Sequence, residues 1–347
     1  MRRGRARARM SAGVVTFGEL LLRLSPPGEE PLFASNELVT YFGGAEANVA
    51  VALSHLGVRC EYVTRVPDNP IGQAGIAALQ REGVGTDWII RGGGGDRLGI
   101  YFVEPGADLR AMRVVYDRVG SAFAGIEPRD VDWPRVLGGA QWLHVSGITP
   151  ALGDGPAAAL ALSVACAHAQ GTPVSFDLNY REALWQDRDP RPVIEPLLHG
   201  VALLIANAGA LHAMLAVDIE GDPLATAAGA RQLAARVAMQ VGARRVALTR
   251  REILGPREHA WSAVLYDAAE EGGGGGAFVQ SRRHVVRVVD RVGGGDSFAA
   301  GLIARLLNGD APERALEFAV TASALKLTVP GDFSRASVRE VEARLHA

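Results

Sequence analysis

The sequence has few cysteines, few aromatic residues and no long apolar run. Cys60 and Cys166 are two cysteines among 347 residues and form no CxxC pair or cluster with histidine, which excludes a disulfide framework and a cysteine metal site. Gly, Arg or Asp interrupts every stretch before the roughly 18 apolar residues of a membrane-spanning helix. A net charge of −2 excludes nucleic-acid binding through overall charge. We therefore expect a cytoplasmic protein with small-molecule partners and neither a nucleic-acid nor a membrane partner.

Lysine is almost missing as well. Lys326 is the single lysine among 36 lysine and arginine residues. Because alanine and glycine are also abundant, this bias indicates genome composition, and an arginine by itself cannot identify an anion site.

Five arginines stand in the opening MRRGRARARM. No apolar secretion segment follows them, and we interpret residues 1–12 as a disordered basic arm, with Met1 or Met10 as the native start.

What the sequence does contain is the pattern of an α/β protein. Short β-branched runs alternate with longer Ala/Leu-rich segments, which is typical of parallel strands joined by crossover helices. The strand candidates are residues 14–17, 60–66, 141–148, 173–177, 201–206, 245–249 and 285–289, and the clearest helix candidates are 156–170 and 223–241. We predict a doubly wound, mostly parallel sheet flanked by helices, in one domain over residues 13–345.

Two segments break this rhythm. Residues 21–42 and 97–118 alternate apolar and polar positions without intervening helices, which predicts extended strands. A small β-strand lid inserted into the α/β body would explain both segments, and such a lid can cover a pocket and exclude water. Two surface hairpins are the alternative.

A glycine run near the C-terminus is the best candidate for chemistry. Gly293, Gly294, Gly295 and Asp296 follow a predicted strand and precede helical periodicity over Ser297–Leu307. Backbone N–H groups at a helix start are unpaired, and the helix dipole is positive there, so this turn suits a phosphate. Asp296 could be the general base that accepts a proton from an attacking hydroxyl. From spacing alone, an N-cap role for this aspartate is equally open.

The chain also resembles a known family. GGGDSFAAG is similar to the GAGD-containing signature of the ribokinase/PfkB carbohydrate kinases, and FGGAEANVAVALSHLG at residues 42–57 is similar to their N-terminal signature. Further segments, including VTFGELLLRLSPPG, VVYDRVGSAFA and FDLNYREALW, resemble in order the 2-keto-3-deoxygluconate kinase branch. The resemblance implies a ribokinase-like fold that uses ATP and Mg²⁺ to phosphorylate the C6 hydroxyl of 2-keto-3-deoxygluconate or a related sugar acid. Asp296 would be the base, with the amides of residues 293–295 as the anion hole.

The resemblance carries further residues into the site. The implied substrate contacts are Gly44, Asn48, Tyr101, Tyr116, Arg118, Arg181 and Asp332, with the two tyrosines closing the lid over the sugar. Arginine suits the carboxylate of a sugar acid because its planar fork can meet both oxygens. Arg181 could instead face the nucleotide phosphates. Arg23 stands where neutral-sugar relatives usually carry aspartate, which favours an acidic substrate.

Departures from the family pattern concern the nucleotide side. The implied nucleotide contacts are Asn207, Thr249, Arg251 and Gly255. The N-x-x-E motif that organises Mg²⁺ has Ala210 in place of its glutamate, which would leave Asp177 or Asn179 as metal candidates. Arg251 replaces an expected glycine, so its side chain either crowds the nucleotide or binds its phosphates.

Two other functions stay open. The missing glutamate and Arg251 are compatible with a degenerate kinase fold that binds a sugar acid or nucleotide without turnover, and a fructokinase-like enzyme for a neutral sugar is the second alternative. Because lids in this family commonly pair, we also expect a homo-oligomer, with a homodimer favoured.

Overall fold

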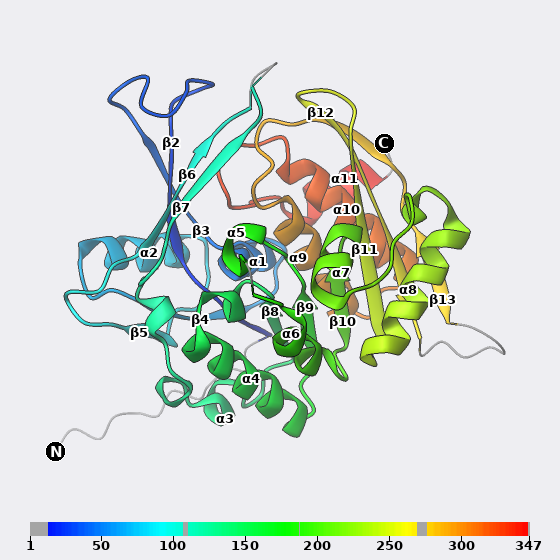
Figure 1. The fold of residues 1–347 in the computed structure, drawn as a ribbon, viewed down its shortest axis with the longest axis horizontal. Coiled ribbons are helices and arrows are strands. Elements are labelled where there is room, and N and C mark those ends of the chain that lie inside the picture. The colour runs from blue at the N-terminus through cyan, green and yellow to red at the C-terminus, as the bar shows by residue number, and fades with distance from the viewer. Residues whose placement is uncertain (1–12, 107–109, 187, 269–275, 346–347) are drawn as a thin grey trace.

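The computed structural model describes residues 13–106, 110–186, 188–268 and 276–345. The predicted basic arm, residues 1–12, lies outside the described residues. A large central sheet runs through the body, and a smaller sheet stands beside it at one side (Figure 1).

Ten described strands form the large sheet, in the order β13-β12-β11-β10-β9-β8-β1-β4-β5, with β14 paired to β12. Neighbours from β5 to β11 are parallel, and β12 is antiparallel to β11, β13 and β14. The strands are β1 (Val14–Phe17), β4 (Cys60–Val66), β5 (Ile89–Arg91), β8 (Trp142–Ser146), β9 (Val174–Asp177), β10 (Leu203–Ala206), β11 (Arg245–Ile253), β12 (Glu258–Asp267), β13 (Ala277–Gln280) and β14 (His284–Arg287). The prediction of a mostly parallel sheet is confirmed.

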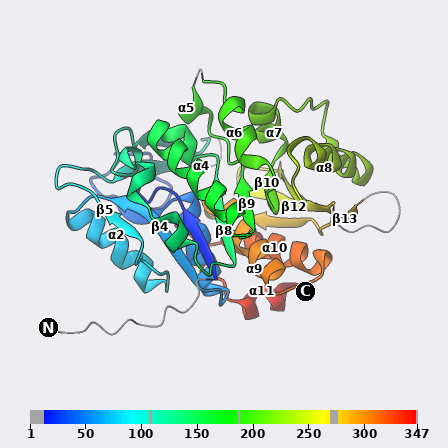
Figure 2. The same ribbon diagram turned by 90° about the horizontal axis from the view of Figure 1, so that it is seen from below.

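Helices cover both faces of this sheet (Figure 2). One face packs against α3 (Trp133–Val136), α4 (Asp154–Ala169), α5 (Glu182–Trp185), α6 (Arg191–Leu198), α7 (Ala208–Leu215) and α8 (Ala227–Val241). The other face packs against α1 (Ala45–His55), α2 (Pro70–Arg81), α9 (Gly294–Leu307), α10 (Pro312–Lys326) and α11 (Val338–Leu345). Strands β1, β8 and β10 are buried along their whole length, which explains their nearly continuous apolar sequences. Of the described helices, none has the length together with the hydrophobicity that a bilayer crossing requires.

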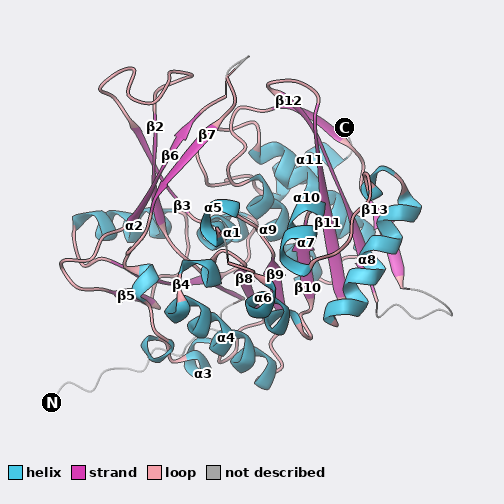
Figure 3. Ribbon diagram, viewed as in Figure 1, coloured by secondary structure: helices cyan, strands magenta, loops and turns pink. Residues whose placement is uncertain are grey.

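The small sheet comes from the two segments that break the α/β rhythm. Its order is β3-β2-β6-β7, with β2 (Leu21–Ser25), β3 (Val39–Gly43), β6 (Gly99–Glu104) and β7 (Arg113–Asp117). Strand β2 is parallel to β6, and the other pairs are antiparallel. The strands β2, β6 and β7 extend beyond the helical layers (Figure 3). The expected second β-rich unit is therefore present.

Candidate active site

A cavity of about 510 Å³ lies where the parallel strands end and the small sheet begins. This is the edge at which open α/β sheets bind ligands, because the connecting loops diverge there. Most residues singled out from the sequence meet at its wall. These are Gly44, Asn48, Tyr101, Tyr116, Arg118, Asp177, Asn179, Arg181, Asn207, Thr249, Arg251, Gly293, Gly294, Gly295 and Asp296.

The first turn of α9 forms one wall of this cavity. Gly293 precedes the helix with a φ of 81°, and a Cβ there would lie 2.2 Å from the carbonyl oxygen of Asp332, so glycine is required at this position. Nothing lies within 4 Å of the Cβ position of Gly295, which faces the cavity. The N–H groups of Gly295 and Asp296 meet no protein acceptor among the described residues, whereas the N–H of Gly294 donates to the carbonyl oxygen of Arg291 at 3.4 Å and is not a free donor of the expected anion hole. The turn therefore offers unpaired donors at the positive end of a helix dipole.

Asp296 belongs to the helix itself. The helix begins at Gly294, three residues before the predicted Ser297, because the glycines form its first turn. No side chain caps this helix, so the N-cap alternative for Asp296 is wrong. Asn48 in α1 instead donates from Nδ2 to Asp296 Oδ2 at 2.7 Å. Burial raises the pKa of Asp296 to about 6, opposed by the Asn48 hydrogen bond and by the positive charge of Arg181.

Two further carboxylates, those of Glu46 and Asp177, lie close enough to Asp296 to interact with its charge. Glu46, 1% exposed, accepts a hydrogen bond from Ser146 Oγ at 2.5 Å, and burial raises its pKa to about 7. A Cβ at residue 18 would lie 1.9 Å from Glu46 Oε2, so Gly18 makes room for this side chain. Burial and the charge of Asp296 also raise the pKa of Asp177 to about 7. Glu46 was not predicted as a site residue, although it lies inside the GGAEAN motif.

Three arginines contact the same cavity beside the α9 turn. Arg181, Arg251 and Arg291 line it, and none of them forms an ion pair with a described carboxylate. Burial, together with the charges of Arg251 and Arg181, lowers the pKa of Arg291. Unpaired like charges around one space are costly unless an anion joins them. Arg291 was missed because nothing but its place before the glycine turn distinguishes it from the other arginines.

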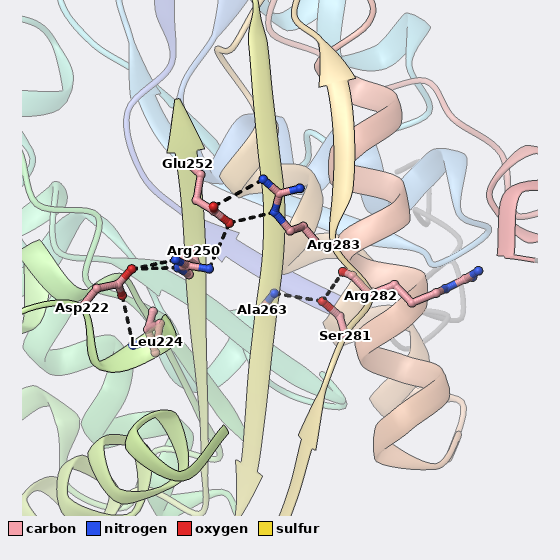
Figure 4. Close-up of polar contacts among 8 residues, drawn as sticks. All are labelled: Asp222, Leu224, Arg250, Glu252, Ala263, Ser281, Arg282 and Arg283. Carbon is pink, nitrogen blue, oxygen red and sulfur yellow. Dashed lines mark hydrogen bonds and ion pairs between the residues drawn. The ribbon is translucent and has the colours of Figure 1, made fainter. Parts of the chain in front are cut away.

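Two neighbouring arginines of strand β11 differ in whether they form ion pairs. Arg250, one position before Arg251, binds Asp222 at 2.8 Å and Glu252 at 3.0 Å, and Arg283 also binds Glu252 (Figure 4). Successive side chains of a strand point to opposite faces. Arg250 is therefore neutralised on one face, while Arg251 reaches the cavity on the other.

The small sheet supplies the opposite wall with aromatic rings. Tyr101 and Tyr116 stack with ring centroids 5.9 Å apart, and the Arg118 guanidinium lies 5.5 Å from the Tyr116 centroid. Arg118 is buried and donates from Nε to Glu19 Oε2 at 2.8 Å, with Nη2 also contacting that carboxylate. Its Nη1 has no protein partner among the described residues.

Three residues from the sequence analysis do not reach this cavity. Asp332 is 1% exposed and lies behind the wall, where it accepts hydrogen bonds from Tyr101 Oη and from Arg23 Nη1. Arg23 Nη1 is 2.7 Å from Asp290 and 2.9 Å from Asp332, so its charge is neutralised and cannot serve as a free cation for the substrate. Gly255 lies in the turn between β11 and β12 and lines a second cavity.

The metal candidates have local partners. Asn207 caps α7, accepting from the N–H of Ala210 at 2.9 Å, while Asp177 Oδ1 accepts from the N–H of Asn179 at 3.0 Å. In the part of the chain that the structure describes, no group of three or more His, Cys, Asp or Glu side chains could enclose a metal ion. Mg²⁺ commonly needs only one or two carboxylates besides water and substrate phosphates, and Asp177 fits that requirement.

Comparison with known proteins agrees with this geometry. The model of the pfkB family of carbohydrate kinases matches residues 11–337. A 2-dehydro-3-deoxygalactonokinase of Haloferax volcanii is 33% identical over 96% of both chains. The crystal structure of a 2-dehydro-3-deoxygluconokinase from Thermotoga maritima is 40% identical, with a TM-score of 0.91 over 97% of this chain and 100% of that one. A putative ribokinase II from E. coli, solved with ATP and Mg²⁺, shares the fold, with a TM-score of 0.77 over 96% of this chain and 99% of that one at 22% identity. The chain therefore belongs to the pfkB family of carbohydrate kinases.

Proposed function

We propose that this kinase transfers the γ-phosphoryl group of ATP to the C6 hydroxyl of 2-keto-3-deoxygluconate or a closely related sugar acid. The observation that carries the proposal is the pairing of the α9 turn with Asp296, which puts anion donors and a proton acceptor side by side. The names of the full-length relatives support the sugar acid as the substrate class.

Different residues of the site would carry out different parts of the reaction. Asp296 accepts the proton of the sugar hydroxyl as that oxygen attacks phosphorus, and the bond from phosphorus to the leaving ADP oxygen breaks. The N–H groups of Gly295 and Asp296 stabilise charge on the transferring group. Mg²⁺ held by the nucleotide phosphates, and by Asp177 directly or through water, would supply further neutralisation.

The sugar subsite is built from unsatisfied groups. Asn48 Oδ1 is buried and has no protein partner among the described residues, so a sugar hydroxyl that donates to it would remove a desolvation cost. Arg118 Nη1 is open to the substrate carboxylate, and the stacked rings of Tyr101 and Tyr116 can cover the sugar. Arg181 lines the same cavity and can serve the carboxylate or the phosphates.

An assay of ADP release with several acceptors tests the proposal. We expect turnover with 2-keto-3-deoxygluconate or its galactonate epimer at a kcat/KM well above that with fructose. Binding of nucleotide without ADP release from any acceptor would support the degenerate-kinase alternative. A preference for fructose would support the neutral-sugar alternative, which Arg23 no longer disfavours because its charge is already paired.

Arg251 offers a prediction on the nucleotide side. We expect Arg251→Ala to raise KM for ATP about 10-fold, the loss typical of one hydrogen bond to a charged group, with a smaller change in kcat. Arg250→Ala is the matched control and should leave KM for ATP unchanged, because Arg250 faces Asp222 and Glu252. A lower KM in Arg251→Ala would mean that the side chain crowds the nucleotide.

The pH dependence of kcat/KM tests the ionisation of the site. Asp296 must be ionised to accept a proton, so kcat/KM should fall below about pH 6 to 7, where Asp296, Asp177 and Glu46 titrate. Asn48→Ala removes a donor that favours the charged form of Asp296, so the acidic limb should move to higher pH whatever the overall loss of activity. A limb near pH 4 would contradict the assignment.

The assembly and location of the enzyme complete the proposal. We propose a cytoplasmic homodimer that pairs through the small sheets, and light scattering coupled to size-exclusion chromatography checks the oligomeric state.

A further inference from the structure

The single lysine of the chain is buried directly behind the anion turn. Lys326 is the last residue of α10 and is 1% exposed. A Cβ at Gly293 would lie 3.2 Å from Lys326 Cε, so the lysine stem packs against the back of this turn. Leu327 lines the cavity, whereas Lys326 does not. The ammonium therefore approaches the site through the peptide backbone and does not enter the space for the ligands.

The Lys326 ammonium is poorly compensated by direct contacts. Its Nζ donates to the carbonyl oxygen of Val329 at 3.3 Å, and among the described residues no carboxylate lies within ion-pair distance. Burial of an ammonium costs several kcal/mol unless it is paired. A methionine of similar length could fill the same apolar space without that cost. The presence of the chain's single lysine at this costly buried position therefore favours a functional explanation.

Charged groups from several elements face this ammonium. Asp290 precedes the turn, Asp296 lies in α9, Arg23 comes from β2, and Asp332 follows α10. Arg23 pairs with Asp290 and Asp332, whereas Lys326 forms no direct ion pair with the described residues and interacts with Asp290 and Asp296 only through their charges. Burial lowers the pKa of Lys326 to about 8, while Asp290 and Asp296 oppose this shift. The positive charge of Lys326 in turn lowers the pKa of Asp296.

We infer that Lys326 is an electrostatic positioning residue for phosphoryl transfer. From behind the turn of α9, its ammonium favours the ionised form of Asp296 and adds positive potential where the transferring group gathers negative charge. This inference rests on the proposed function, and it assigns Lys326 no contact with either ligand.

The variant Lys326→Met tests the inference. We expect kcat to fall about 10- to 100-fold, within the range for loss of one stabilising group in an anion hole, while KM for the sugar acid stays within about 3-fold. The melting temperature should be unchanged or higher, because an undercompensated buried charge is removed. In the wild type, kcat should decline above about pH 8 as Lys326 loses its proton. In Lys326→Met this alkaline decline should vanish, and the acidic limb of kcat/KM should move to higher pH.

A matched variant separates this effect from simple loss of a buried cation. Arg305 in α9 is 9% exposed and binds Glu342 at 3.1 Å, far along the helix from the turn. Arg305→Met should lower the melting temperature without changing the pH profile. Lys326→Arg keeps the charge and should recover part of the kcat that Lys326→Met loses.

The outcomes separate failure of the proposed function from failure of the role of Lys326. A wild-type protein without ADP release from any sugar acid would overturn the proposed function. An active wild type together with Lys326→Met of normal kcat and unchanged pH limbs would overturn the role of Lys326 alone. A Lys326→Met variant that unfolds at lower temperature and keeps its pH profile would show a purely structural lysine.

Discussion

Replacement of Asp296 by asparagine is expected to lower kcat at least ~100-fold, the range for a lost general base, with sugar and nucleotide affinities within a few-fold of the wild type. Asparagine keeps the shape and can still meet Asn48, but it cannot accept the hydroxyl proton. Steady-state assays of ADP release measure the loss, and calorimetric titration measures the affinities.

The stability of this variant is equally informative. Burial raises the pKa of Asp296 to about 6, so at pH 8 its folded state holds a carboxylate that would ionise more easily in the unfolded chain. Asp296→Asn should therefore unfold at the same temperature or higher at pH 8. Asp222→Asn, on the exposed ion pair with Arg250, is a control that should keep full activity. Near-normal turnover in Asp296→Asn would refute the assignment of the base.

The glycines of the α9 turn give the second large effect. Gly295→Ala is expected to lower kcat/KM about 100-fold or more, because its methyl group would stand in the open space of the anion site and displace the transferring group. The fold should not suffer, since nothing lies within 4 Å of the new Cβ and alanine favours a helix. Thermal unfolding and steady-state kinetics measured on the same sample test both statements.

Gly293→Ala is the matched contrast at the neighbouring position. Its φ of 81° and the Asp332 carbonyl oxygen 2.2 Å from the Cβ position predict a loss of folding free energy, about 1 to 3 kcal/mol. Gly295→Ala should thus lose activity without losing stability, while Gly293→Ala should lose both. Equal stability losses in the two variants would argue that the turn serves the fold alone.

The architecture could be predicted because its signals are local. Alternating strand and helix patterns fall within short windows, and the glycine turn lies within the helix that it begins. The start of α9 was misplaced by three residues because glycines are poor helix formers in isolation, whereas here they form the first turn.

The site was less predictable where charges pair over long distances. Arg23 meets Asp290 and Asp332 across more than 260 residues of sequence, so its neutralisation could not be foreseen from spacing. For the same reason, Asp332 was placed with the substrate although it binds Arg23 and Tyr101. Glu46 and Arg291 lie within motifs, but no local pattern distinguishes a side chain that faces a cavity from one that faces solvent.

The hydrogen bond between Asn48 and Asp296 joins residues 248 positions apart. During synthesis on the ribosome, α1 emerges long before α9, and its apolar side must wait for α9 to pack on it. The base and its partner cannot meet until nearly the whole polypeptide has left the exit tunnel. Catalytic activity therefore requires a chain synthesised at least through α9, and products of premature termination upstream of α9 would be inactive.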